Sequence, residues 1–155
     1  MVMDRKINVA SVRMQPLDPL DPSLELLHFG FRGLTVDADR FLATLGLSRV
    51  HHRILYVIAR SDEINVGDLA ATLGVSKQAL HRPLTHLFER ELVGYTRQAG
   101  RHRFKLLVLS ERGAEVERQA SELERRALRE AFAATDAAGR DAWDAVMRVL
   151  AERLN

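Results

Sequence analysis

The chain has 155 residues, of which 46% are hydrophobic and 28% charged, so it is long enough to bury one sizeable core. It contains no cysteine, which excludes disulfides, a cysteine-ligated zinc site, a thiol nucleophile and thiol-based redox sensing. The net charge of +2 is too weak by itself to indicate a nucleic-acid partner, and the absence of an apolar leader or a membrane-length apolar run predicts a cytoplasmic protein with no membrane partner.

The N-terminal residues 1–22 include the run PLDPLDP, and they predict an extended arm because a helix does not pass through such a run. Ser23 is typical of a helix N-cap, and apolar residues at helical spacing predict a first helix over residues 23–45. Ser48 begins a second predicted helix, with an apolar face that includes Leu55 and Ile58.

Two further helices and a hairpin follow. Asn65 begins a short helix that Gly74 ends, and Ser76 begins another that runs to about Arg90. The LGVS linker between them has the spacing of a helix-turn-helix. Strands over residues 93–97 and 105–109, joined by a basic tip that contains glycine, predict a β-hairpin wing.

Ser110 and Asp136 begin the last two predicted helices. The expected fold is therefore mainly α with a small β-hairpin wing: a winged helix-turn-helix over residues 48–109, flanked by helices over 23–47 and 110–155. The flanking helices carry apolar stripes with no partner left in so small a core, which predicts dimerisation through them. The alternative is a monomer with a larger helical cap.

Positive charge is concentrated in one segment. Residues 76–105 contain seven Lys or Arg against two Glu, so this segment carries 7 − 2 = +5 while the whole chain carries +2. The rest of the chain is therefore net acidic, and the basic surface is local.

A helix that reads DNA sequence projects polar side chains from its N-terminal turns into the major groove. Gln78 is suited to an adenine edge and Arg82 to guanine or phosphate, while free N–H groups at the helix start suit a phosphate. A basic wing tip is suited to the minor groove. The predicted DNA contacts are Ser76, Lys77, Gln78, His81, Arg82 and Thr85 on the helix, and Arg101, His102 and Arg103 on the wing. The alternatives are a solvated helix face and a solubilising turn.

The segment over residues 45–113 resembles the core of the MarR family of bacterial transcription regulators, through the spacing LA..LGVSK..L.R.L..L...LV followed by a wing and LSERG. The resemblance implies a homodimer that binds a pseudo-palindromic operator, usually as a repressor released by a small ligand. Two residues depart from the family pattern. Arg101 stands where the wing usually has an acidic residue, and Pro83 is expected to strain or kink the recognition helix.

In MarR-like proteins the ligand pocket often lies between the first helix, the second helix and the dimerisation helices. Basic side chains beside an apolar cleft would suit an anionic aromatic ligand, such as an aromatic acid or a phenol. His52 is also expected to be a core residue with one hydrogen bond, and Arg32 to have Asp37 or Asp39 as alternative partners. The predicted effector-binding residues are His51, as the preferred candidate, and His28, Phe31, Arg32 and His52.

Other classes of protein have less support. The sequence has no phosphate-binding glycine loop, nucleophile elbow or metal-hydrolase signature, so no enzyme and no cofactor are predicted. Adjacent histidines on a helix point roughly 100° apart and seldom bind one metal ion, so no metal site is predicted either. The remaining alternative is a winged helix without an effector, used for protein–protein contact or for non-specific architectural DNA binding.

Overall fold

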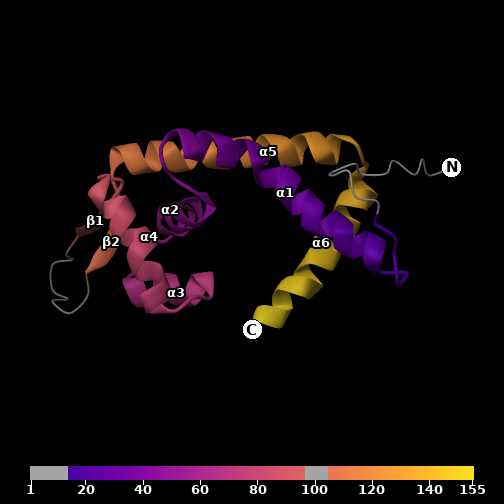
Figure 1. Ribbon diagram of the computed structural model, residues 1–155, viewed down its shortest axis with the longest axis horizontal. Coiled ribbons are helices and arrows are strands. Elements are labelled where there is room, and N and C mark those ends of the chain that lie inside the picture. Colours follow the sequence, from indigo (N-terminus) through magenta and orange to yellow (C-terminus); the bar gives the residue numbers. More distant parts are fainter. Residues whose placement is uncertain (1–13, 97–104) are drawn as a thin grey trace.

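The computed structural model describes residues 14–96 and 105–155 (Figure 1). The predicted fold class is confirmed: helices predominate, and β1 and β2 form one antiparallel hairpin. The elements are α1 (Asp21–Thr44), α2 (Arg49–Arg60), α3 (Val66–Leu73), α4 (Lys77–Glu89), β1 (Val93–Thr96), β2 (Leu106–Leu109), α5 (Glu111–Ala133), α6 (Ala137–Ala151) and the short 3₁₀ helix η1 (Glu152–Leu154).

The helix starts follow from local capping chemistry. In each of α3, α4, α5 and α6 the N-cap side chain accepts a hydrogen bond from the backbone N–H three residues later, at 2.8–3.0 Å. Gly74 ends α3 with a φ of 68°, a backbone conformation that favours glycine. The residues that supply the caps are Asn65, Ser76, Ser110 and Asp136, all of which the sequence predicts as helix starts.

The start of α1 differs from the prediction. The helix begins at Asp21 and includes Pro22 in its first turn, where the missing N–H of proline has no intrahelical partner to lose. The Asp21 carboxylate accepts hydrogen bonds from the N–H groups of Leu17 (2.7 Å) and Asp18 (3.0 Å). The expectation of an extended arm to Pro22 is therefore wrong in the described residues: residues 17–20 form bends and a turn, Asp21 and Pro22 belong to the helix, and Ser23 lies inside it.

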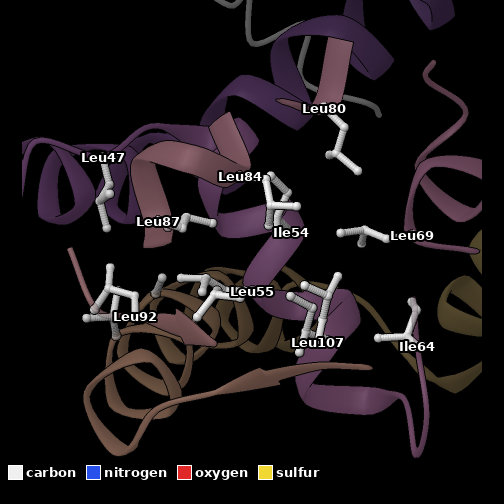
Figure 2. Close-up of a cluster of buried hydrophobic side chains, with 14 of the residues drawn as sticks. Leu47, Ile54, Leu55, Ile64, Leu69, Leu80, Leu84, Leu87, Leu92 and Leu107 are labelled. Carbon is white, nitrogen blue, oxygen red and sulfur yellow. The ribbon is translucent and has the colours of Figure 1, made fainter. Parts of the chain in front are cut away.

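The hydrophobic core lies where α2 is surrounded by α3, α4, the hairpin and α5. Figure 2 shows Ile54 and Leu55 of α2 pointing toward leucines of α4 and toward Leu107 of β2. The N–H of Leu107 also donates to the carbonyl of Ile64 (2.8 Å), which ties the hairpin to the segment before α3. The helix-turn-helix and the wing therefore share one core, centred on α2.

The glycine of the LSERG motif, Gly113, lies where two parts of the backbone approach closely. A Cβ atom at this position would lie 2.0 Å from the backbone oxygen of Leu92, because α5 begins directly against the segment that leads into β1. Ser110 reinforces this junction: its N–H donates to the carbonyl of Leu92 (3.0 Å) and its hydroxyl to the carbonyl of Glu91 (2.7 Å). The glycine allows the close approach that places the hairpin at the start of α5.

The long helix α5 joins two parts of the molecule. In Figure 1 the winged helix-turn-helix lies below one end of α5, while α1 crosses α5 and α6 descends from its other end.

Apolar side chains are exposed on the N-terminal half of α1 and along the whole of α6. Leu20, Leu24, Leu27 and Phe31 form one stripe and are between 38% and 69% exposed. Trp143, Val146 and Leu150 of α6 are between 43% and 60% exposed.

None of the helices in the described part of the chain is long and apolar enough to span a membrane.

Candidate DNA interface

The helix α4 presents a polar face and an apolar face. Leu80, Leu84 and Leu87 are buried in the core, and the side chains between them point outward. Of the predicted DNA-contacting residues on this helix, Thr85 is half-buried and the others are exposed: Ser76, Lys77, Gln78, His81 and Arg82. The structure therefore brings the predicted set together on one accessible surface at the N-terminal end of α4.

Pro83 does not interrupt this helix, which runs continuously from Lys77 to Glu89. Proline lacks an N–H, so the carbonyl of Ala79, four residues earlier, has no intrahelical donor.

The start of α4 has free backbone donors. The Ser76 hydroxyl accepts from the N–H of Ala79 (3.0 Å), which leaves the N–H groups of Lys77 and Gln78 directed out of the helix start. This end of α4 therefore combines free backbone donors with a cationic side chain.

The predicted wing contacts Arg101, His102 and Arg103 lie outside the described residues. Lys105, the residue directly before β2, is exposed, and its Nζ lies 5.3 Å from the centre of the Tyr95 ring. Lys105 belongs to the basic segment of residues 76–105 but is not among the predicted DNA contacts.

His51 lies at the start of α2 and faces α4. Its Nδ1 accepts a hydrogen bond from the N–H of Ser48 (2.9 Å), and its ring stacks on that of His86 with centroids 4.7 Å apart. His86 in turn donates from Nε2 to the carbonyl of Gly46 (3.0 Å) and accepts at Nδ1 from Arg90 (3.4 Å). Burial, followed by the nearby His86 and Arg90, lowers the pKa of His51. The arrangement thus favours the neutral form of His51, which ties α2 to the end of α4.

The lowered pKa of His51 predicts a loss of stability in acid. Below the ordinary histidine pKa of about 6.5, the unfolded chain takes up a proton at His51 that the folded chain resists, so the free energy of unfolding falls as pH falls. His51→Gln should show a smaller loss between pH 7.5 and 5.5, because glutamine can accept from Ser48 N–H but does not titrate. Urea midpoints at both pH values measure this. An unchanged dependence in His51→Gln would contradict the assignment.

The five predicted effector-binding residues do not share one site. His52 is buried between α2 and α5, while His51 faces α4. His28 is exposed and contacts the Phe29 ring edge-on, and the Phe31 ring lies against the guanidinium groups of Arg49 and Arg53 on α2.

Arg32 is the predicted effector residue that lines a described pocket. The pocket has a volume of about 600 Å³ and lies along α1 where α2 begins. Asp39 accepts from Arg49 (2.5 Å), which raises the pKa of Arg49, and Asp37 pairs with Arg40 (3.4 Å). Neither aspartate therefore pairs with Arg32, which has no carboxylate partner among the described residues. The pocket is lined by Leu26, Phe29, Gly30, Arg32, Gly33, Val36, Asp39 and Arg49.

Sequence reasoning missed Phe29 and Arg49 as lining residues of this pocket. Their participation depends on how α2 packs back against α1, which the spacing of apolar residues does not specify. Within residues 14–96 and 105–155, no three histidine or carboxylate side chains are grouped so that they could hold a metal ion.

The capped helix pair α3–α4, the hairpin and the polar face of α4 define a winged helix-turn-helix protein. Residues 45–103 match the model of the MarR family. The chain is 38% identical over 119 residues to the HTH-type transcriptional regulator PetP of Rhodobacter capsulatus, a match that covers 76% of this chain and 70% of PetP. The chain therefore belongs to the MarR family of transcriptional regulators, which are not enzymes.

Solved structures agree with this fold. AbsC, a MarR family transcriptional regulator from Streptomyces coelicolor, superposes with a TM-score of 0.69 at 23% identity, over 91% of this chain and 98% of AbsC. A MarR protein from Peptoclostridium difficile superposes with a TM-score of 0.74 at 17% identity, over 94% of each chain. At these identities the similarity establishes the shared fold.

Proposed function

We propose that this regulator is a homodimer that reads a pseudo-palindromic operator with two copies of α4, acts as a repressor, and is released by a small anionic aromatic ligand. The observation that carries the DNA-reading part is the exposed polar surface at the N-terminal end of α4. There Gln78 and Arg82 project from a helix whose opposite face is fixed in the core. The wing residues Arg101, His102 and Arg103 are proposed to contact the minor groove beside it.

The uncovered apolar surfaces support the dimer. Leu20, Leu24, Leu27 and Phe31 follow one another at spacings of four, three and four residues, so they form a continuous line on α1. No residue of α6 is buried, although the helix carries Trp143 and two valines. Large apolar surfaces of this kind mark interaction sites, and a second copy would bury both helices in one symmetric interface.

Selection from random DNA with the full chain tests the proposed function. The expected result is enrichment of an inverted repeat whose half-site centres are about one helical turn, roughly 34 Å, apart. Binding to the selected site should weaken as salt rises, because Lys and Arg contacts to phosphates release counterions. A flat sequence preference would contradict operator recognition and would favour a non-specific architectural binder.

For the effector, Arg32 replaces His51 as the proposed anion-binding residue, because Arg32 lines the pocket and has no carboxylate partner among the described residues. Aromatic carboxylates and phenols that bind the native protein should raise its thermal midpoint. Arg32→Gln should remove this shift, because it removes the cation, whereas His51→Gln should retain it, because that ring faces α4. The reverse pattern, measured by thermal shift, would return the effector site to His51.

A further inference from the structure

A buried polar cluster joins α2 to α5. The buried polar or charged residues in the described part of the chain are Thr35, His52, Glu117 and Ser121, and the last three lie together at the crossing of these two helices. Thr35 has its hydrogen-bond partner within α1, because its hydroxyl donates to the carbonyl of Phe31 (3.0 Å). The other three connect the winged helix-turn-helix to the helix that leads to the opposite end of the molecule.

The hydrogen bonds of this cluster have one consistent direction. The Ser121 hydroxyl donates to Oε1 of Glu117 (2.5 Å), so the Ser121 oxygen is left to accept from Nε2–H of His52 (3.1 Å). Arg60 donates from Nη1 to the same Glu117 oxygen (2.7 Å). On the other side of the imidazole, Nδ1 of His52 lies 3.5 Å from Oε1 of Glu124.

The cluster extends along two turns of α2. His52, Tyr56 and Arg60 are spaced four residues apart, and the Arg60 guanidinium lies over the Tyr56 ring at 3.5 Å from its centre. His52 and Arg60 are therefore both attached to α5, roughly 12 Å apart along the axis of α2. Two attachment points restrict rotation and sliding of α2 more than a single contact would.

Polar contacts of this kind specify a geometry more than they add stability. A buried ion pair or hydrogen-bonded group loses its hydration, so an apolar replacement of similar volume is often equally stable. Apolar surfaces, however, permit several crossing angles, whereas directional hydrogen bonds with no unsatisfied buried atom favour one. In the described residues every buried side-chain polar atom has a partner, so the cluster is complete at this crossing.

The opposite face of α2 holds the DNA-reading helix. Ile54, Leu55 and Ile58 pack into the core shared with α4 and the hairpin, as Figure 2 shows for the first two. A change in the angle of α2 on α5 would therefore carry α4 with it as part of one packed unit. The distance and rotation between two α4 helices in a dimer depend on this angle.

We propose that the cluster of His52, Arg60, Glu117 and Ser121 is a positioning device that sets the angle of the winged helix-turn-helix on α5 and thereby the half-site spacing that the regulator prefers. This inference depends on the proposed function, because it requires a dimer that reads two half-sites. The four residues touch neither DNA nor effector in this role. They act through the placement of α4.

The test uses Ser121→Ala and Glu117→Leu, which each remove a hydrogen-bonding group, in the full chain, with binding measured on operators whose spacer is lengthened or shortened by one and two base pairs. The wild-type chain should prefer one spacing by about tenfold, as expected when base contacts in one half-site are misplaced. Both variants should bind with the preference reduced toward equality. Ser121→Thr, which keeps the hydroxyl, should restore it, and Arg118→Ala, at an exposed ion pair on α5, should leave it unchanged.

The possible failures can be told apart. Variants that retain the wild-type preference, or that lose affinity equally at all spacings, would overturn the positioning role and leave the proposed function standing. A wild-type chain without any preferred spacing would overturn both. Because only relative affinities among spacings are compared, a general loss of stability in a variant does not imitate the expected result.

Discussion

Replacing Gln78 and Arg82 together with alanine should lower the affinity for the selected operator by at least about thirtyfold per half-site. Each good side-chain pair with a base edge contributes about 1–3 kcal/mol of discrimination, and both side chains project from exposed positions on α4. The fold should be unaffected, because neither residue contributes to the core that Leu80, Leu84 and Leu87 form. Fluorescence anisotropy on the operator and on a scrambled duplex measures both affinities.

The scrambled duplex separates sequence reading from charge. Affinity for scrambled DNA should fall much less than affinity for the operator, because non-specific binding depends on phosphate contacts, of which Arg82 is at most one. Glu89→Gln is the matched control, since it changes an exposed residue at the far end of the same helix. Equal losses on both duplexes would mean that Gln78 and Arg82 do not read bases.

The fold could be predicted from the sequence where local chemistry decides it. Asn65, Ser76, Ser110 and Asp136 begin their helices because each side chain caps a backbone N–H only three residues away. The predicted start of α1 is wrong: the N-cap is Leu20 and not Ser23, because a proline in the first turn loses no intrahelical hydrogen bond and so does not exclude Pro22 from the helix.

The predicted effector-binding residues show what local patterns cannot specify. Periodicity places His51 on a particular side of α2, but whether that side faces α1 or α4 depends on how the helices pack. The spacing from Ser48 to His51 was a usable signal, because a side chain at the third helical position often accepts from the N-cap N–H. His52 presented the same difficulty: its partner Ser121 lies 69 residues away in the sequence, so only the packing of α5 reveals it.

The same distinction applies to the DNA interface. The polar face of α4 could be predicted because a helix that buries Leu80, Leu84 and Leu87 must expose the side chains between them. The role of Gly113, in contrast, required the structure, since it arises from the close approach of α5 to the backbone of Leu92. The motif LSERG indicates that a glycine belongs at position 113, but it does not show the contact with Leu92 that requires one.

Placing a charge on either uncovered apolar surface should convert the proposed dimer to monomers. Leu24→Glu on α1 and Val146→Glu on α6 each introduce a carboxylate at a side chain that is at least 60% exposed in the single chain, so the isolated fold should tolerate both. In a dimer the same carboxylate would be buried without a partner, which is strongly unfavourable. Sedimentation equilibrium should give half the wild-type mass for each variant.

Loss of the dimer should also weaken operator binding on the order of 10²–10⁴-fold, because two linked half-site contacts would become two independent ones. Arg148→Glu, on the charged side of α6 with Asp141 and Asp144, is the control, and it should remain dimeric although its change in charge is larger. Because Leu24 lies on α1 and Val146 on α6, outside the winged helix-turn-helix, a loss of operator binding in their variants would act through association and not through a DNA contact. Variants that remain dimeric and bind normally would show that these surfaces have another partner, and that the two α4 helices are brought together elsewhere.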